Sequence, residues 1–188
     1  MRIGMTLFQG KYRIESIRLK GWDYTSPGEY FVTICTKGMV EWFGRVNGNV
    51  MQMNDIGDVA RRCWIEIPQH HTDIALDEFI VMPNHVHGII VINEHHGENR
   101  RDVAGNVSTG TTPSISPKSG SLSAIIRSYK SAVTNWCAKH GYDDFTWQPR
   151  FYDHIIRNDK SLNTIREYIR NNPAHWESDR NQFSQPTD

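Results

Sequence analysis

The chain has 188 residues, of which 38% are hydrophobic, and this is enough for one domain with a single core. Its 21 basic and 21 acidic residues give a net charge of zero, which excludes a strong overall field that would attract nucleic acid. No long apolar run is present, so we expect no membrane span and no secretory signal. The three cysteines, Cys35, Cys63 and Cys137, form no CxxC pair, and we expect a reduced, cytoplasmic protein.

The first half of the chain predicts a strand, a hairpin and a helix. Residues 28–38 combine β-branched and aromatic side chains between glycines, which is typical of a strand. Residues 41–54 predict a short hairpin with the sequence NGN at its tip. Residues 55–67 carry an apolar stripe at helical spacing, with Asp55 as the predicted cap and Pro68 as the predicted end.

Residues 77–92, DEFIVMPNHVHGIIVI, predict a second strand that contains two histidines. Side chains alternate between the two faces of a strand, so His85 and His87 share a face and Val86 points into a core. Pro83 predicts a sheet edge or a bulge just before His85. Gly88 should leave space beside the pair. Taken alone, the two imidazoles fit a metal site, a phosphate site or half-exposed structural residues.

Residues 93–120 are rich in Gly, Ser, Thr, Asn and Pro, and they predict a flexible polar loop. We interpret His95 and His96 within it as solvated residues rather than metal ligands. A helix should follow, because Ser121 can cap it and an apolar stripe runs from Leu122 to Cys137. Gly141 suits its C-terminal end. Tyr129 lies on the stripe, which favours simple core packing.

Aromatic and basic residues interleave in residues 145–158, where residues 151–157 predict a last strand. Such a mixture suits base stacking and phosphate contacts, but it is equally typical of a core strand with exposed polar alternates. The candidate DNA contacts are Trp147, Arg150, His154 and Arg157, together with Arg127 and Lys130, which lie off the apolar stripe of the preceding helix.

The last predicted element spans residues 161–176, where a helix should begin at its cap Ser161 and carry an apolar stripe of Leu162, Ile165 and Ile169. At roughly 100° per residue, Tyr168 and Asn172 lie about 40° apart at one edge of that stripe, and they are neighbours one turn apart. Arg166 and Arg170 lie on its other side. Asn172 precedes Pro173, so we expect it to end the helix, with residues 177–188 as a short tail.

This order of strands and helices predicts an α+β sandwich, in which helices cover one antiparallel or mixed sheet. We expect residues 1–188 to form a single domain. Within it, neutral imidazoles of His85 and His87 could hold a divalent cation, with an Asn carbonyl oxygen as a third ligand. Tyr168 could then be a nucleophile, although a phenol with a pKa of ~10 needs a metal or a base nearby. The metal would polarise a scissile phosphate.

Four sequence blocks in this order carry a resemblance to a known family. They are SIRLKGWDYTSPGEYFVTICT, the His-hydrophobic-His motif in MPNHVHG, WQPRFYDHIIRN and EYIRNNP. Over roughly residues 12 to 176, the chain resembles the REP-associated tyrosine transposases of the single-tyrosine HUH superfamily. A lone His-X-His motif is a weak signal, whereas four blocks in the right order are a strong one.

The resemblance implies a ferredoxin-like α+β fold with a central antiparallel sheet and helices packed on it. It also implies nicking and strand transfer of single-stranded DNA near short REP-like hairpins, through a 5′-phosphotyrosine intermediate. Tyr168 matches the nucleophile, and His85, His87 and Asn172 match the ligands of a Mg²⁺ or Mn²⁺ ion. Trp147, Arg150 and His154 fall in the block that flanks the DNA-binding face. Members of the superfamily act as monomers or homodimers.

Two other functions remain open on the sequence. The chain could be a transposase-derived protein that binds hairpin DNA without cutting it. It could also be a metal-dependent hydrolase that uses water, with Tyr168 as a packing residue. The neutral charge and the polar loop at 93–120 depart from the often basic family pattern, and both bear on DNA affinity more than on chemistry.

Overall fold

The structure is a computed structural model that describes residues 6–8, 11–13, 19, 21–94 and 117–183, with side chains described for 19, 21–94 and 117–176. Most of the predicted polar loop at 93–120, including His95 and His96, lies outside these residues, as does much of the predicted tail. None of the helices in the described ranges combines the length and the hydropathy of a membrane span.

The central feature is a four-stranded antiparallel sheet. Its strands are β3 (Gly28–Cys35), β6 (Ile74–Met82), β7 (His85–Ile92) and β8 (Tyr152–Ile156). They lie in the order β6-β7-β3-β8, so that the first and third strands in chain order occupy the centre. With the intervening helices, this is the split β-α-β arrangement of the ferredoxin-like fold, and the predicted fold class is confirmed.

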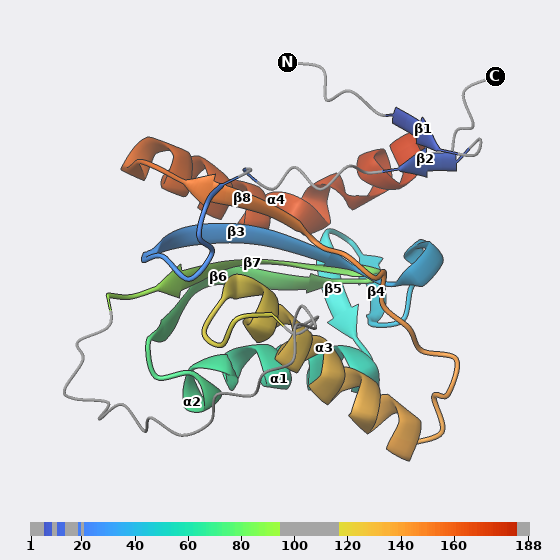
Figure 1. Ribbon diagram of the computed structural model, residues 1–188. Helices are drawn as coiled ribbons and strands as arrows, with labels where there is room; N and C mark the ends of the chain where they lie inside the picture. Colours follow the sequence, from blue (N-terminus) through green and yellow to red (C-terminus); the bar gives the residue numbers. More distant parts are fainter. Residues whose placement is uncertain (1–5, 9–10, 14–18, 20, 95–116, 184–188) are drawn as a thin grey trace.

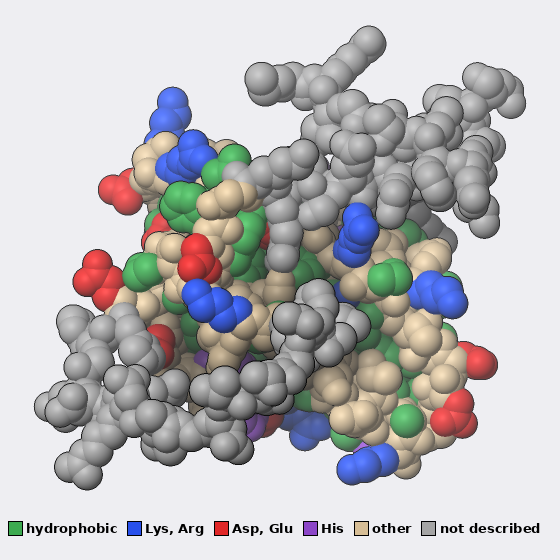
Figure 2. Space-filling view, in the orientation of Figure 1, with side chains coloured by type: hydrophobic (Ala, Val, Ile, Leu, Met, Phe, Trp, Pro, Cys, Tyr) green, Lys and Arg blue, Asp and Glu red, His purple; other side chains and the backbone are tan. Residues whose placement is uncertain are grey.

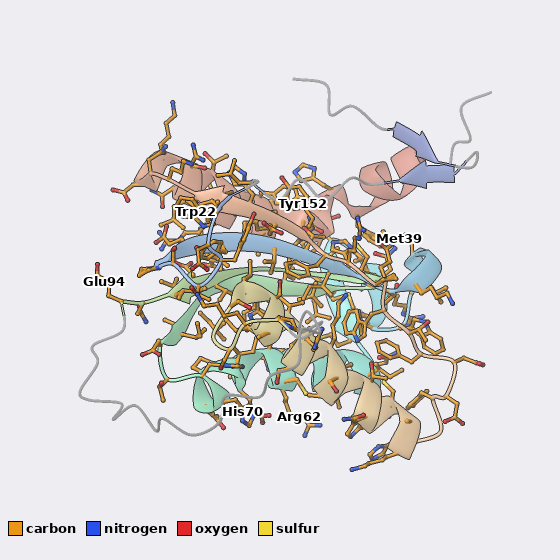
Figure 3. All side chains as sticks on the ribbon, viewed as in Figure 1. Trp22, Met39, Arg62, His70, Glu94 and Tyr152 are labelled. Carbon is orange, nitrogen blue, oxygen red and sulfur yellow. The ribbon has the colours of Figure 1, made fainter. Side chains whose placement is uncertain are left out.

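The helices cover both faces of the sheet. They are α1 (Asp55–Ile65), α2 (Ile67–His70), α3 (Leu122–Lys139) and α4 (Asp159–Phe183). Helices α1, α2 and α3 lie on one face, and α4 lies alone on the other (Figure 1). Tyr152 lies on the α4 side of the sheet, whereas Arg62 and His70 lie at the far side of the opposite layer (Figure 3). The sheet is therefore the middle of three layers.

Smaller elements extend this framework. The predicted hairpin at 41–54 is confirmed as β4 (Gly44–Asn47) paired with β5 (Val50–Met53). Gly48 and Asn49 form its tip with φ angles of 56° and 64°, the positive values that a tight hairpin turn requires. A 3-10 turn spans Lys37–Met39, and a second hairpin joins β1 (Thr6–Phe8) to β2 (Lys11–Arg13).

Each face of the sheet has its own apolar core. The larger core lies against α1 and α3, and it includes Tyr30, Val32, Ile34, Val86, Ile90, Ile126 and Val133. The smaller core lies against α4, and it consists of Phe31, Ile89, Ile156, Leu162 and Ile169, with partly buried neighbours. Because alternate residues of β7 enter the two cores, the predicted orientation of Val86 away from the histidines is confirmed.

The prediction of one histidine-bearing strand over 77–92 is wrong, because these residues form a hairpin. Strand β6 already begins at Ile74, and Met82 and His85 pair across a turn made by Pro83 and Asn84. Pro83 therefore occupies a turn rather than a bulge or an edge, which suits its missing N–H. Strand β7 itself lies inside the sheet.

The structural reason for a glycine at position 88 also differs from the predicted one. A Cβ atom there would lie 2.3 Å from Cζ2 of Trp64. The glycine thus makes room for the indole of α1 on the opposite face of the sheet, and it does not open space beside the histidines.

Three helix boundaries differ from prediction. Asn54 rather than Asp55 caps α1, since its side chain accepts a hydrogen bond from the Gly57 N–H. Pro68 lies in the first turn of α2, where its missing donor costs nothing, instead of ending a helix. The cap of α4 is Asn158, whose Oδ1 accepts from the N–H of Ser161 at 2.9 Å. By contrast, the predicted Ser121 cap of α3 and the positive φ of Gly141 after it are confirmed.

The end of the last helix is also later than predicted. Helix α4 continues through Pro173 and ends at Phe183. A proline in a helix interior removes one hydrogen bond and clashes with the preceding turn. Packing of the following turn offsets this, because Trp176 is only 5% exposed and lies against the sheet.

Candidate active site

The two histidines of β7 lie together on the face that α4 covers. Their ring centroids are 4.3 Å apart, and the residues are 9% and 5% exposed for His85 and His87. This proximity follows from strand geometry, because residues two apart point the same way. Sequence reasoning predicted the shared face, and the structure adds that the pair is almost fully buried.

The turn that precedes β7 orients His85. Asn84 Oδ1 lies 2.7 Å from Nδ1 of His85, and Asn84 Nδ2 donates to the Met39 carbonyl at 3.1 Å. Since the amide nitrogen is used elsewhere, the amide oxygen accepts and Nδ1 of His85 carries the proton. The Nε2 lone pair of His85 is then free to bind a ligand. A second group that fixes the tautomer in this way is common among metal-binding histidines.

The neighbouring strand holds His87. Thr33, its register partner on β3, places Oγ1 2.9 Å from Nδ1 of His87. Phe31 stacks on the imidazole with ring centroids 5.4 Å apart and an interplanar angle of 28°. The contact with Thr33 uses Nδ1 and turns Nε2 of His87 toward α4.

Burial keeps both imidazoles neutral. It lowers the pKa of His85 to about 4, and it lowers the pKa of His87 well below its ordinary value, with a further contribution from the adjacent His85. Neutral imidazole is the form that binds a metal ion, so no proton competes for the ligand atoms near neutral pH.

Helix α4 places a tyrosine over the pair. Tyr168 Oη lies 3.3 Å from Nε2 of His87, and the ring meets Phe31 edge-on at a centroid distance of 6.2 Å. The residue is nevertheless 44% exposed, so its hydroxyl lies at the boundary between the buried site and solvent. A substrate at the surface can therefore reach a hydroxyl that lies beside His87.

Asn172, one turn after Tyr168, brings an amide into the site. The residue is 2% exposed, yet neither Oδ1 nor Nδ2 has a hydrogen-bond partner among the described residues. Nε2 of His85 is likewise buried without one. The amide still lies close enough to His85 to oppose the lowering of its pKa. Unsatisfied buried polar atoms are costly and rare, and here they converge from β7 and α4.

These atoms fit a divalent cation. Nε2 of His85, Nε2 of His87 and Oδ1 of Asn172 are neutral ligand atoms of the kind that bind divalent cations. Three such ligands leave coordination positions open for substrate oxygens. No group of three or more His, Cys, Asp or Glu side chains within the described ranges could hold a metal ion. The candidate set therefore depends on the amide oxygen as its third member.

Trp176 is part of the site but was not predicted from the sequence. It is buried, and its ring lies 6.0 Å from that of His85. Tyr168, Asn172 and Trp176 are spaced four residues apart, which puts them along one helix face. That spacing was visible in the sequence, but it was missed because Pro173 was taken to end the helix.

Four of the six predicted DNA contacts lie away from this site. Arg127 and Arg150 are exposed and line a groove of about 500 Å³ between α3 and the segment before β8. Lys130 instead donates to the carbonyls of Gln148 and Arg150 at 2.6 and 3.1 Å, and burial lowers its pKa to about 8. Its role is at least partly structural.

Trp147 has a similar role. Its indole N–H donates to the Lys130 carbonyl at 3.2 Å, and its ring packs against Phe43, Tyr129 and Phe145. The contacts of this half-buried residue match the core-packing alternative.

The other two predicted contacts lie in the edge strand β8 and directly after it. His154 is the register partner of Phe31, and it lines a groove of about 440 Å³ with Phe31 and Tyr152. An adjoining groove reaches Arg157. Because Phe31 also contacts His87 and Tyr168, this surface leads up to the site. On the face in Figure 2, basic and acidic side chains are interspersed, in keeping with the zero net charge.

Comparison with known proteins finds one protein with a similar sequence and solved structures with a similar fold. No protein-family profile matches the chain. The chain is 40% identical over 175 residues to an uncharacterised protein of Haemophilus influenzae, and the match covers 90% of this chain and 93% of that one. The two proteins belong to one family.

Two solved structures resemble it more distantly. One is a REP-associated tyrosine transposase bound to a REP hairpin, with a TM-score of 0.53 and 20% identity over 85% of this chain and 74% of that one. The other is a candidate transposase from Deinococcus radiodurans, with a TM-score of 0.45 and 15% identity over 81% and 96%. The chain has the fold of the first, which agrees with the family resemblance seen in the sequence.

Proposed function

We propose that this chain, a relative of the Haemophilus influenzae protein with the fold of a REP-associated tyrosine transposase, nicks and rejoins single-stranded DNA beside a hairpin. The observation that carries the proposal is the placement of the Tyr168 hydroxyl 3.3 Å from Nε2 of His87, next to buried donor atoms of His85 and Asn172 that lack partners. A nucleophile and a cation site at one surface position are what phosphoryl transfer requires.

In this proposal, His85, His87 and Asn172 hold Mg²⁺ or Mn²⁺. The bound ion would polarise the scissile phosphate and stabilise the charge of the transition state. The protein contributes the orientation of the ligands, because Asn84 and Thr33 fix the two imidazoles from behind. Burial keeps the rings neutral, and Trp176 excludes water from the His85 side.

Tyr168 is the proposed nucleophile. Its phenolic oxygen attacks phosphorus, the new O–P bond forms, and the bond from phosphorus to the 3′ oxygen breaks. The phenolic proton leaves to solvent, which the 44% exposure of the residue allows, and the departing 3′ oxygen takes up a proton to become a hydroxyl. The 5′-phosphotyrosine retains the energy of the phosphodiester, so attack by a 3′-hydroxyl can reverse the step and join strands.

The surface along β8 is the proposed path of the strand. His154 and Arg157 can contact phosphates there, and Tyr152 offers a ring for a base. Because the chain is neutral overall, we expect DNA affinity to depend on this local surface and to fall as salt increases.

The test is a covalent-adduct assay. Protein is mixed with labelled single-stranded hairpin DNA from beside its own gene, with Mn²⁺ or Mg²⁺, and run on a denaturing gel. We expect a protease-sensitive shifted band that requires metal and is absent in Tyr168→Phe. Tyr142→Phe is the control, since this tyrosine stacks on Trp136 of α3 and has no role in the proposed site, and it should keep the adduct.

The two alternative functions predict other results. DNA that is bound in a native gel but never linked, across several flanking hairpins and both metals, would favour a binding protein without nicking activity. Metal-dependent cleavage that persists in Tyr168→Phe would favour a hydrolase that uses water. Light scattering of the free and DNA-bound protein would decide between monomer and homodimer.

A further inference from the structure

Strand β6, at the edge of the sheet, contains an irregularity with two acidic residues. Its register with β7 shifts between Leu76 and Phe79, so Asp77 and Glu78 fall outside the regular pairing. Bulges of this kind re-aim side chains at sheet edges and near functional sites. Here the Glu78 N–H donates to Asp77 Oδ1 at 2.6 Å, which holds the Asp77 carboxylate in place.

Both acidic residues bind arginines of α4. Arg166 Nε donates to Asp77 Oδ1 at 2.9 Å, and its Nη2 donates to Asp77 Oδ2, so the contact is bidentate. Arg170 Nε donates to Glu78 Oε1 at 2.8 Å. Successive residues of the β6 bulge thus bind successive turns of the helix. A bidentate contact fixes orientation as well as distance.

The position of these arginines on α4 determines what the contacts can do. At roughly 100° per residue, Arg166 and Tyr168 are about 160° apart around the helix axis. The apolar stripe of Ile165 and Ile169 faces the sheet between them. The arginines therefore hold one flank of α4 to β6, while Tyr168 and Asn172 on the other flank reach toward the histidines. Any rotation of the helix that breaks the arginine contacts moves the tyrosine.

We propose that Asp77 and Glu78 are positioning residues, which bind Arg166 and Arg170 and so set the rotation of α4 that holds Tyr168 and Asn172 at the histidine pair. This inference rests on the proposed function of the site. It assigns a role to residues that touch neither substrate nor metal, and it explains why an edge strand carries its acidic residues at a bulge.

Of the two contacts, the one between Asp77 and Arg166 should contribute more to the position of α4. Its side chains are 18% and 31% exposed, whereas those of Glu78 and Arg170 are 35% and 54% exposed. Hydrogen bonds from Arg166 also hold the pKa of Asp77 below its ordinary value. Exposed ion pairs contribute little, but a half-buried bidentate pair is less screened by solvent than the more exposed contact of Arg170.

The experiment compares the full-length wild type with Arg166→Asp, Asp77→Arg and the double variant that exchanges the two charges. Adduct formation is measured at saturating DNA and metal, and DNA affinity is measured separately. We expect each single reversal to slow adduct formation at least tenfold with DNA affinity within about twofold, and the exchange to restore much of the rate. Arg166→Lys loses the bidentate geometry, and its rate of adduct formation should lie between those of the wild type and Arg166→Asp. This variant keeps the experiment informative if a charge-reversed variant does not fold.

The matched control is Asp23→Asn, which breaks the exposed ion pair with Lys118. It should leave the adduct rate unchanged. Equal rates in wild type and Arg166→Lys, or rates that follow thermal stability alone and are not restored by the charge exchange, would overturn the positioning role.

A second measurement separates this inference from the proposed function. Mn²⁺ affinity, by calorimetry, reports whether Asn172 on α4 reaches the histidines, and it needs no DNA. If the wild type forms no adduct but Arg166→Asp weakens Mn²⁺ binding and the exchange restores it, the nicking function is wrong and the positioning role stands. If neither adduct nor Mn²⁺ affinity responds to Arg166→Asp, the positioning role is wrong.

Discussion

The two faces of strand β7 bury side chains of different kinds. On the face toward α1 and α3, Val86 and Ile90 are fully buried in an apolar core. On the face toward α4, His85 and His87 are almost as deeply buried, yet Nε2 of His85 and both amide atoms of Asn172 lack hydrogen-bond partners. Adjacent residues of one strand thus enter an apolar core and a layer of buried polar side chains, although Trp64 Nε1 and Tyr129 Oη in the apolar core also lack hydrogen-bond partners among the described residues.

The apolar core stabilises the fold, whereas the polar layer holds the residues to which the proposed function assigns a role. An apolar core gains stability from each buried group, whereas a buried polar atom without a partner costs about 1–3 kcal/mol. Under the proposed function, a bound cation would satisfy Nε2 of His85 and Oδ1 of Asn172. The α1 and α3 face should therefore respond to mutation in stability, and the α4 face in activity.

Asn172→Leu should produce the largest effect on activity and sharpen this contrast. The near-isosteric change removes a proposed ligand and two unsatisfied atoms together. We expect adduct formation and Mn²⁺ affinity to fall by at least about tenfold, while the free energy of unfolding rises by about 1 kcal/mol. Calorimetry measures the Mn²⁺ affinity, and urea denaturation without metal measures the free energy of unfolding. A variant that is less stable and binds Mn²⁺ normally would show that Asn172 is a structural residue.

Ile90→Ala tests the opposite face of the same strand. The side chain is fully buried, so its loss should cost about 2–5 kcal/mol of unfolding free energy. The adduct rate per folded molecule should stay within about twofold of wild type, because Ile90 enters the core on the face of the sheet opposite to the histidine pair. A tenfold loss of rate in the folded fraction would mean that the two faces are not independent.

Gly88→Ala probes the α1 and α3 face through the backbone. The added Cβ would lie 2.3 Å from Trp64, so the indole must move, at a cost of about 1–3 kcal/mol. Trp64→Leu should recover part of this loss in the double variant, as measured by thermal denaturation. If the double variant is no more stable than the sum of the single changes predicts, the contact with Trp64 is not the cause.

Acid titration should give the smallest effect, on the α4 face. The folded-state pKa of Asp77 is lowered, mainly by hydrogen bonds from Arg166, so its stabilising contribution is present above the ordinary value of 3.8 and is lost as pH falls below it. In Asp77→Asn, the free energy of unfolding should therefore fall less steeply as the pH is lowered through this range. An unchanged slope of stability against pH below the ordinary pKa of 3.8 would show that the ion pair adds nothing measurable to stability.

Much of the sandwich could be predicted because its patterns are local. Alternation in residues 28–38, the NGN turn and the apolar stripe after Ser121 each specify an element within a few residues. The shared face of His85 and His87 follows from strand geometry alone. Tyr168 and Asn172 were predicted to lie side by side for the same reason, since both belong to one helix.

The features that the sequence did not reveal depend on contacts between distant segments. Pro83 was placed within a strand because a two-residue turn has little signal of its own, and only pairing of Met82 with His85 defines it. Pro173 was expected to end α4, but the packing of Trp176 extends the helix. The role of Lys130 likewise depends on carbonyls from residues 148 and 150, which no periodicity in α3 could indicate.

The position of α4 along the chain has a consequence for synthesis. The histidine pair is complete at residue 87, but Tyr168 and Asn172 lie in the last helix that the structure describes. While the ribosome is still making α4, Phe31, Ile89 and the two imidazoles have no helix over them. The proposed nucleophile and ligands can therefore meet only after residue 172 has emerged from the ribosome. Under the proposed function, a nascent chain shorter than this would carry the histidine pair and yet be unable to cut DNA.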